Sequence, residues 1–458
     1  MPPDDTIAAI ATPIGEGGLA VIRISGADAF AVADKIFLPV GKNSAKPSAA
    51  NSHTLQFGRI VRGERVIDEV LLAVLRAPRT FTRENTVEIS CHGGILPAKL
   101  VLDTILENGA RLAEPGEFTR RAFLNGRIDL AQAEAVADLI HSRTELALTA
   151  ANEQLAGKLS QRINQLRDDL LHTLAHVEAH IDFPDEDIAP DTKGKLLERL
   201  ETGVKFMDEL LRTADEGQIL RRGIRAAIIG RPNAGKSSLL NQLLGRDRAI
   251  VSPVPGTTRD TIEETANIRG LPVIFIDTAG LREARDEIEM EGVRRSRESL
   301  ANAEFILQVL DASEPLTSAD KKFISEFGDK KRIFVRNKID LPIKLELPKE
   351  VHSSLVTDVS CLSGQGIEPL KDAIKKLVWS GEIRAEMLQV MINSRHQNAL
   401  NRARVAAERT INALRGAETL ELVALELRIA VAAVGEIVGK TTTEDLLDSI
   451  FSQFCIGK

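Results

Sequence analysis

Aromatic residues are scarce in this chain of 458 residues, which has no tyrosine, one tryptophan and 15 phenylalanines. Platforms that hold single-stranded RNA stack its bases on aromatic side chains. The scarcity therefore argues against such a platform, and it favours helix-rich domains with aliphatic cores. Cysteine is rarer still, with only Cys91, Cys361 and Cys455. Their odd number and wide spacing exclude a disulfide framework and a zinc-binding pair, and favour a reducing compartment.

A positive net charge and a long apolar run are both missing. The net charge is −7, so any RNA contact would depend on a local basic patch or on a partner. The first residues, MPPDDTIAAI, lack the basic region of a signal peptide and the arginines of a transit peptide. No apolar run approaches the roughly 18 residues that span a membrane. We therefore expect a cytoplasmic protein that acts without a membrane.

Residues 1–117 mix strand and helix signals. The runs TIAAIATP and GLAVIRIS predict two strands separated by the glycine-rich turn IGEGG. TVEISCHGG predicts a further strand, and the segment ILPAKLVLDTILENGA after it is typical of a helix. This part of the chain is predicted to be an α+β domain.

The helical signal dominates residues 118–215. Apolar residues recur at intervals of three or four from Leu155 to Ile181, which predicts one continuous helix that ends before Pro184. Residues 379–458 are predicted to be helical again. The simplest packing joins the two helical segments in one bundle, with residues 216–378 inserted into it.

Residues 216–378 alternate between strand and helix. The short apolar runs RAAIIG, LPVIFID, FILQVLD and KRIFVRNK are each followed by a polar loop, as in a parallel sheet with crossover helices. The predicted fold class is therefore a multidomain α/β and α arrangement: an N-terminal α+β domain, a helical bundle and an inserted α/β domain.

The strongest motif is GRPNAGKSS, residues 230–238, which matches the phosphate-binding pattern GxxxxGK[ST] between an apolar run and a leucine-rich helix. Gly230 and Gly235 let the backbone curl so that its N–H groups face phosphates. Lys236 supplies a positive charge, and Ser237 offers a hydroxyl ligand to Mg²⁺. Alone, this loop does not separate ATP from GTP.

Three further segments indicate a guanine nucleotide and a Ras-like GTPase. DTAG, residues 277–280, is suited to the Mg²⁺ shell and the γ-phosphate. NKID, residues 337–340, ends in an aspartate that can accept the paired donors of guanine, and VSCLSGQG offers a hydroxyl and an amide near the guanine carbonyl. The predicted GTP-binding residues are Asn233, Ala234, Gly235, Lys236, Ser237, Ser238, Ser252, Thr257, Thr258, Asp277, Thr278, Ala279, Gly280, Asn337, Lys338, Asp340, Ser360 and Cys361.

The segment VPGTTRD, residues 254–260, lies where the first switch is expected, and Thr258 can reach Mg²⁺ while the γ-phosphate is present. Leu281 follows Gly280, whereas Ras-type enzymes have a glutamine there that orients the attacking water. Either hydrolysis is very slow or another group orients the water. The acidic run EARDEIEMEG offers candidates, although an exposed switch helix accounts for this run equally well.

The chain resembles the bacterial tRNA-modifying GTPases of the MnmE (TrmE) family over essentially its whole length. The motifs that carry the resemblance are ATPIGEGG with RISG, CHGG, PGEFTRRAFLNGRIDLAQAEA, GRPNAGKSSLLN and the terminal FCIGK. Other GTPases lack the motifs at both ends. The resemblance implies a folate-binding N-terminal domain that also forms a homodimer, a helical domain and an inserted Ras-like GTPase domain.

The resemblance also implies an activity. Members of this family are potassium-activated GTPases that act on tRNA with an FAD-containing partner, MnmG, in a heterotetramer. The complex builds an aminomethyl or carboxymethylaminomethyl group on C5 of the wobble uridine. A 5-formyl- or 5,10-methylene-tetrahydrofolate supplies the one-carbon unit, glycine or ammonium supplies the nitrogen, and GTP hydrolysis drives conformational cycling.

The resemblance assigns roles to particular residues. Arg23, Glu88, Arg127 and Lys458 match the folate-binding positions, of which Arg127 is often lysine in the family. Asn233, Ser252, Val254 and Thr257 match the potassium ligands, beside the Mg²⁺ ligands Ser237 and Thr258. Glu289 aligns with the glutamate that orients the attacking water, which answers the missing glutamine. Cys455 is the second catalytic candidate, as a thiol near the folate.

Three roles unrelated to folate compete for Cys455, since a cysteine this close to the end can be a lipid anchor, a metal ligand or part of a frayed tail. Gly457 and Lys458 do not suit prenylation, and no cysteine or histidine lies nearby to share a metal. The apolar helix predicted at EDLLDSIFSQF favours a docked tail. Two rival functions remain: a GTP-dependent binding factor with no use for folate, and a mechanical scaffold for which Cys455 is dispensable.

Overall fold

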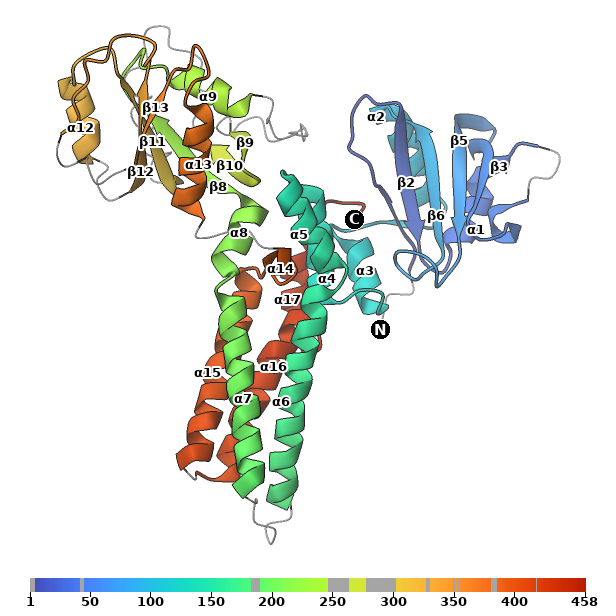
Figure 1. The fold of residues 1–458 in the computed structure, drawn as a ribbon. Coiled ribbons are helices and arrows are strands. Elements are labelled where there is room, and N and C mark those ends of the chain that lie inside the picture. The colour runs from blue at the N-terminus through green and yellow to red at the C-terminus, as the bar shows by residue number, and fades with distance from the viewer. Residues whose placement is uncertain are drawn as a thin grey trace. The chain divides into compact units, whose positions relative to one another are not determined.

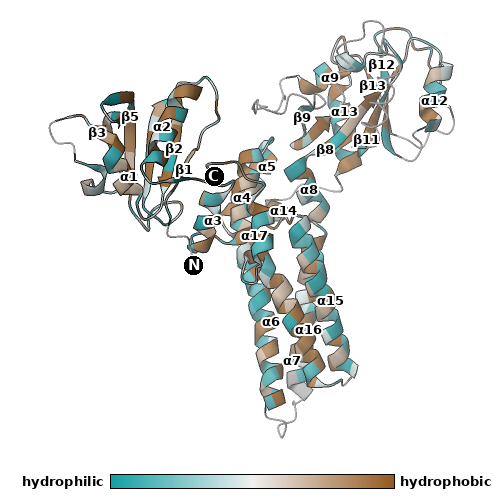
Figure 2. Cartoon of the chain, turned by 180° about the vertical axis from the view of Figure 1, so that it is seen from behind, coloured by the Kyte–Doolittle hydropathy of each residue, from teal (hydrophilic) through white to brown (hydrophobic). Residues whose placement is uncertain are grey.

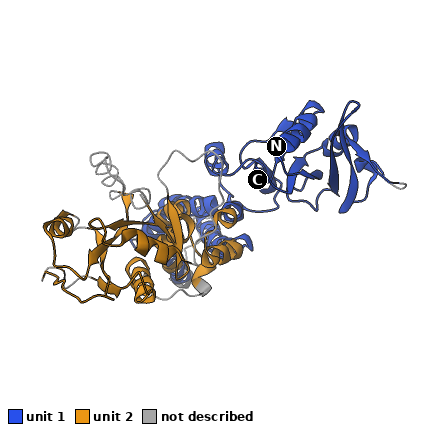
Figure 3. Ribbon diagram, turned by 90° about the horizontal axis from the view of Figure 1, so that it is seen from above, with its two compact units in different colours: residues 1–137, 155–204, 402–458 blue, residues 138–154, 205–401 orange. Residues whose placement is uncertain are grey.

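A computed structural model describes residues 5–41, 45–182, 190–245, 263–276, 302–326, 330–348, 351, 355–379, 385–416 and 418–458. Its contacts divide the chain into two compact units (Figure 3). The first contains residues 1–137, 155–204 and 402–458, and the second contains residues 138–154 and 205–401. The units cut across the four predicted segments, because the helices α7 (Pro190–Leu211) and α15 (Ser394–Gly416) each contribute residues to both.

The first unit contains a seven-stranded, mostly antiparallel sheet with strand order β3-β4-β5-β6-β2-β1-β7. The predicted strands are present as β1, β2 and β6, and the predicted helix follows as α2 (Figure 1). The strands are β1 (Ile7–Ile10), β2 (Leu19–Ser25), β3 (Phe37–Pro39), β4 (Thr54–Arg62), β5 (Arg65–Leu75), β6 (Thr86–His92) and β7 (Arg111–Leu112), and the helices are α1 (Ala29–Ile36), α2 (Ile95–Glu107) and the short 3₁₀ turn η1 (Pro47–Ala49).

The two faces of this sheet differ in character. Successive side chains of a strand point to opposite faces, and Ile22, Leu72 and Ile89 lie in the buried core with residues of α1 and α2. Their neighbours in the strands therefore face away from these helices. Arg23 and Glu88 are a directly paired couple on that second face.

The helical part of the first unit follows the sheet. Here one prediction was wrong: the stripe from Leu155 to Ile181 is not one helix, because α5 (Glu145–Leu155) ends and α6 begins only at Lys158. Gly157 has φ +84° in the break, a conformation that favours glycine. From Leu159 to Val177 the stripe is buried as predicted, and hydrophobic and hydrophilic residues alternate along α6 (Figure 2).

Helices that come before and after the inserted α/β segment in the sequence pack together in the first unit. Helix α6 (Lys158–Asp182) packs along α16 (Leu420–Val438), and the Arg428 guanidinium of α16 pairs with Glu178 of α6 at 2.7 Å. Arg415 of α15 pairs with Glu201 of α7 at 2.5 Å. The remaining helices of this unit are α3 (Glu117–Leu124), α4 (Leu130–His141), whose last residues lie in the second unit, and α17 (Glu444–Phe451).

The second unit contains a six-stranded sheet with order β13-β12-β11-β8-β10-β9. The four predicted strands are present and pair in parallel. The prediction missed two edge strands: β9, which pairs antiparallel with β10, and β13. The elements are α8 (Ala214–Arg222), β8 (Ile224–Ile229), α9 (Lys236–Leu244), β9 (Glu264–Ile268), β10 (Leu271–Phe275), β11 (Phe305–Asp311), α12 (Ser318–Glu326), β12 (Lys331–Asn337), β13 (Leu355–Val359), α13 (Ile367–Val378) and α14 (Ala385–Leu388).

A helix that crosses a membrane needs about 20 consecutive, mostly apolar residues. Among the residues placed by the structure, no helix is both long enough and apolar enough to meet this requirement.

Candidate functional site

The predicted phosphate-binding loop leaves β8 and enters α9, as its motif requires. Gly230 has φ +149°, and a Cβ atom there would lie 2.3 Å from the Val309 carbonyl oxygen. Gly235 has φ +96°, and its Cβ would lie 2.1 Å from the Asn337 side-chain nitrogen. Only glycine fits at either position, so both glycines of the motif are explained by backbone geometry and close packing.

Lys236 begins α9 and folds back over the loop. Its ammonium donates to the carbonyl oxygens of Gly230 and Arg231, both at 2.9 Å. Burial lowers the pKa of Lys236 from its usual value. A phosphate would provide the anionic partner that a half-buried ammonium needs, and the N-terminus of α9 would add to the attraction.

Asn337, at the end of β12, connects the predicted base-recognition segment, residues 337–340, to the predicted phosphate-binding loop. Its side-chain nitrogen donates to the Ala234 carbonyl at 2.9 Å, and its side-chain oxygen accepts from the Cys361 N–H at 3.1 Å. Ser360 donates to one carboxylate oxygen of Asp340 at 2.5 Å. Asp340 is exposed, so its other oxygen remains available for the paired donors of guanine.

A cavity brings these segments together. It lies beside the phosphate-binding loop and the base-recognition segment, and its size and mixed lining suit a nucleotide. Nine of its lining residues were predicted to bind GTP, and two others, Pro232 and Leu362, were not. The predicted lining residues are Asn233, Gly235, Lys236, Ser237, Ser238, Asn337, Lys338, Asp340 and Cys361.

One further contact at this cavity has no signal in the sequence. Lys338 donates to Asp311 at 2.5 Å, and Asp311 is also 3.6 Å from the Arg231 guanidinium of the phosphate-binding loop. Burial opposes the ionisation of Asp311, but bonds from Lys338 and Ser313 outweigh it, and the pKa of Asp311 lies below its usual value. Asp311 is therefore an anion that holds both segments in place.

Several predicted site residues lie outside the described parts of the chain. They belong to both switch segments and include the proposed water-orienting glutamate. These residues are Ser252, Val254, Thr257, Thr258, Asp277, Thr278, Ala279, Gly280 and Glu289.

The predicted folate-binding residues gather in the first unit. The guanidinium of Arg23 bonds to the Glu88 carboxylate at 2.8 Å and lies 5.5 Å from the centre of the Phe118 ring. Arg127 donates to the Thr80 carbonyl at 2.8 Å, and its guanidinium is 5.7 Å from the Phe81 ring. Phe118 and Phe81 belong to one apolar cluster. Both arginines therefore border the same cluster.

The C-terminal tail docks beside this cluster and is not frayed. The main-chain oxygen of Lys458 accepts a hydrogen bond from the Phe118 N–H at 3.2 Å. Ile456 forms a β-bridge with Pro115, and the Cys455 carbonyl accepts from the Gly116 N–H at 3.4 Å. The thiol of Cys455 remains exposed.

The helix that precedes the tail is anchored as its apolar pattern predicts. Leu447, Ile450 and Phe451 of α17 pack with Phe454 against Leu130 and Ala133 of α4. The Thr443 hydroxyl caps the helix by accepting from the Leu446 N–H. Two of the four predicted folate-binding residues thus contact Phe118: Arg23 through its guanidinium and Lys458 through its main chain. Phe118 lies within the motif PGEFTRRAFLNGRIDLAQAEA, but it was not among the predicted site residues.

Comparison with known proteins identifies the family. The family model for the MnmE helical domain matches residues 130–455, and the model for the GTP-binding protein TrmE N-terminus matches residues 6–127. The protein named tRNA modification GTPase MnmE from Geobacillus kaustophilus (strain HTA426) is 48% identical over 461 residues, 99% of both chains. Its namesake from Bacillus velezensis (strain DSM 23117 / BGSC 10A6 / LMG 26770 / FZB42) is 47% identical over 99% of this chain and 100% of its own.

Among solved structures, an Era variant from Aquifex aeolicus bound to GDP.AlF4- is 30% identical over 40% of this chain and 66% of its own, with a TM-score of 0.27, too low to carry an argument. The two family models together span almost the whole chain, and the two MnmE proteins match it from end to end. The chain therefore belongs to the MnmE family of tRNA modification GTPases.

Proposed function

We propose that this protein is a potassium-activated GTPase that works with an FAD-containing partner, MnmG, on the wobble uridine of tRNA in the cytoplasm. The product carries an aminomethyl or carboxymethylaminomethyl group on C5, with the carbon supplied by a tetrahydrofolate and the nitrogen by glycine or ammonium. The observation that carries this proposal is the docking of the Cys455–Lys458 tail at Phe118, next to Arg23 and Glu88. A GTPase that only switched between bound partners would have no use for a thiol held there.

The nucleotide cavity supports the GTPase part of the proposal. Lys236 would neutralise the β- and γ-phosphates, and Asp340 would accept the donors of guanine. Ser237, Thr258 and Asp277 would hold Mg²⁺, directly or through water, and this ion would neutralise charge that develops on the phosphates. Hydrolysis would release Thr258, and this release would drive the conformational cycle.

Potassium would take the place of an arginine finger. Asn233 lines the cavity with φ +63°, a conformation that asparagine tolerates better than most residues. With Ser252, Val254 and Thr257 it would hold K⁺ beside the phosphates. An arginine finger increases the hydrolysis rate by about 10³–10⁵, so exchange of K⁺ for Na⁺ should slow hydrolysis strongly. Equal rates in the two salts would remove this part of the proposal.

The folate site would bind its ligand through one acidic and two basic side chains. Glu88 presents a carboxylate to the paired donors of a pterin, and Arg23 orients that carboxylate through its 2.8 Å bond. Arg127 and Lys458 would attract the glutamyl carboxylates of 5-formyl- or 5,10-methylene-tetrahydrofolate. The exposed Cys455 thiol would then lie near the one-carbon group.

The sheet face that carries Arg23 and Glu88 also supports a homodimer. Leu55, Phe57 and Leu71 on this face are 62%, 48% and 40% exposed. They are contiguous, since Phe57 pairs with Leu71 and Leu55 with Ala73, which itself pairs with Glu88. Exposed apolar patches of this kind mark interaction sites, and a heterotetramer with MnmG would be built on such a dimer. A Phe57→Glu variant should have a monomeric mass in solution, and a dimeric mass would exclude this face.

The decisive experiment tests the thiol. Cells that carry Cys455→Ser should lose the C5 modification in nucleoside analysis of their tRNA, while the purified variant hydrolyses GTP at the original rate. Ser452→Ala, which changes an exposed residue at the C-terminal cap of α17, just before the tail, is the matched control and should modify tRNA normally. Full modification in the Cys455→Ser cells would overturn the role of the thiol.

A further inference from the structure

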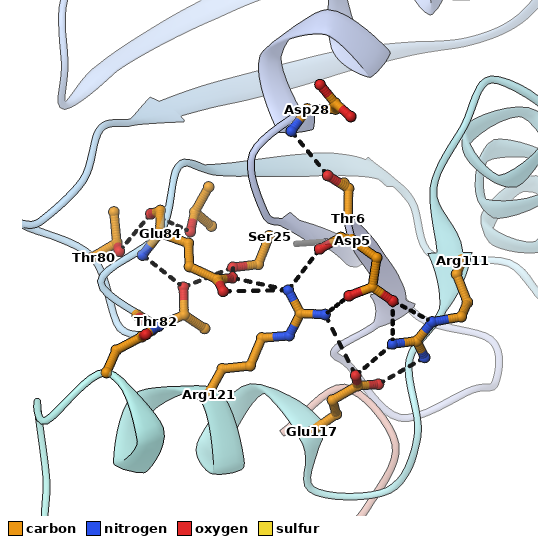
Figure 4. Close-up of polar contacts among 12 residues, drawn as sticks. Asp5, Thr6, Ser25, Asp28, Thr80, Thr82, Glu84, Arg111, Glu117 and Arg121 are labelled. Carbon is orange, nitrogen blue, oxygen red and sulfur yellow. Dashed lines mark hydrogen bonds and ion pairs between the residues drawn. The ribbon is translucent and has the colours of Figure 1, made fainter. Parts of the chain in front are cut away.

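Arg121 is one of the largest fully buried side chains among the residues that the structure describes, with only 1% of its surface exposed. It lies on α3, and its guanidinium joins three segments that are distant in sequence (Figure 4). One terminal nitrogen donates to the Asp5 carbonyl at 2.8 Å and to the Glu84 carboxylate at 3.2 Å. The other donates to the Asp5 carboxylate at 2.6 Å and to Glu117 at 3.5 Å.

A second guanidinium closes this network. Arg111, which follows α2, bonds to Asp5 at 2.7 Å and to Glu117 at 2.6 Å. Three carboxylates thus share two guanidiniums. Burial opposes the ionisation of Glu117, but Arg111, the Glu114 N–H and Arg121 outweigh it and keep the pKa of Glu117 below its usual value. Well-packed apolar side chains often stabilise a protein core at least as much as a buried ion pair does. A contribution to stability alone therefore does not explain this network.

The network touches the turn on which the C-terminal tail rests. Glu117 accepts from the Glu114 N–H at 2.8 Å and thereby fixes residues 114–117. The next N–H groups hold the tail: Gly116 donates to Cys455 and Phe118 to Lys458. A carboxylate held by two guanidiniums therefore determines the direction of the backbone donors that bind the tail.

The same network also holds strand β1, against which the tail packs. Gly457 packs so closely against the end of β1 that a Cβ atom there would lie 2.4 Å from the Ile10 carbonyl oxygen. Strand β1 begins two residues after Asp5, whose carbonyl and carboxylate both bind Arg121. The same side chain thus holds the turn at residues 114–118 and the start of the strand on which Gly457 packs.

We propose that Arg121, acting through Glu117, is a positioning residue for the C-terminal tail, which it holds so that Cys455 and Lys458 face the folate site. The role of the tail at that site rests on the proposed function. The seating of the tail does not, because it follows from contacts within this chain and can be measured without substrate.

The test compares Glu117→Gln with Glu69→Gln in the full-length protein. Glu69 is exposed on β5 and pairs only with Arg59 among the described ion pairs, so the control removes the same charge in the same unit, away from the tail. In Glu117→Gln, amide hydrogen exchange in residues 452–458 should be about tenfold faster, because weaker contacts allow local opening. The dissociation constant for 5-formyl-tetrahydrofolate should rise by about tenfold, and the kcat and KM for GTP should stay within about twofold of the original.

The outcomes separate the two proposals. Faster tail exchange with weaker folate binding supports both. Faster tail exchange with unchanged folate binding supports the positioning role and overturns the place of the tail in the folate site. Unchanged tail exchange overturns the positioning role. If Glu117→Gln does not fold, Arg121→Lys takes its place, since it keeps the buried positive charge but removes the fork of nitrogens that reaches Asp5, Glu84 and Glu117 together.

Discussion

The side-chain amide of Asn337 donates a hydrogen bond to the carbonyl oxygen of Ala234 at 2.9 Å. This bond ties the predicted base-recognition segment to the predicted phosphate-binding loop, although the two residues are 103 positions apart in the chain. Asn337 is 2% exposed and also accepts from the Cys361 N–H. One buried side chain thus sets the distance between the two ends of the nucleotide cavity.

The first prediction tests this link. Asn337→Ala should weaken both GTP and GDP binding by at least about fivefold, because leaving buried partners without hydrogen bonds costs about 1–3 kcal/mol. Titration with a fluorescent guanine nucleotide measures the effect. Asn108→Ala removes a side-chain bond to the Thr104 carbonyl in the first unit, and it should leave nucleotide affinity unchanged. Equal affinities in all three proteins would contradict the prediction.

The second prediction concerns the water-orienting group. Glu289→Ala should bind GTP with unchanged affinity but lose hydrolysis, because Leu281 offers no group that could orient the attacking water. Single-turnover hydrolysis measures the chemical step directly. Glu287→Ala, in the same acidic run, is the matched control and should keep most of its activity. A normal turnover rate in Glu289→Ala would show that another residue orients the water.

The third prediction concerns Gly116, which packs against the end of α17. Gly116 has φ +69°, and a Cβ atom there would lie 2.6 Å from the Phe451 carbonyl oxygen. Gly63 has φ +60° with no atom within 4 Å of the same position. Both Gly→Ala variants incur the cost of a left-handed backbone, about 1–3 kcal/mol, but only Gly116→Ala also clashes.

Gly116→Ala should therefore unfold at a lower temperature than Gly63→Ala, and its C-terminal residues should exchange their amide hydrogens faster. Circular dichroism and hydrogen exchange are the suitable probes, because the only tryptophan, Trp379, lies in the second unit. Equal melting temperatures for the two variants would mean that the C-terminal end of α17 does not pack against Gly116.

The fourth prediction separates the three thiols by pH. Burial and the charge of Asp68 raise the pKa of Cys91 to about 11, and burial and the charge of Asp340 raise the pKa of Cys361 to about 11. At pH 8 only about one thousandth of either thiol is the reactive thiolate. A disulfide reagent should thus find one fast thiol, the exposed Cys455.

The reaction of Cys91 and Cys361 should accelerate as the pH rises towards 11, since their thiolate fraction grows about tenfold per pH unit below the pKa. Cys455→Ser should remove the fast phase at pH 8 and leave the slow phase unchanged. A fast phase that survives this substitution would show that Cys91 or Cys361 is also reactive at pH 8.

Local pattern predicted most elements of the fold, and its errors have physical causes. The break at Gly157 was missed because Leu155 and Leu159 are four residues apart, as in a continuous helix. The spacing of apolar residues does not reveal that Gly157, between them, has a left-handed backbone conformation. Strand β9 was missed because its sequence, ETANI, contains no apolar run; among the described strands it lies at the edge and pairs with β10. The parallel central strands β8 and β11 were found because they are almost fully buried and mostly apolar, and β12 because its centre, Ile333–Val335, is a buried apolar run.

By itself, the sequence was enough to predict the phosphate-binding loop and the base-recognition segment, because each is a short contiguous motif whose chemistry depends on neighbouring backbone groups. It also determined that the end of the chain is an apolar helix followed by a thiol. Only the tertiary structure decided where that thiol is held. The Phe118–Lys458 bond and the Arg121 network join residues that are distant in the chain, and no local pattern contains the distance between them.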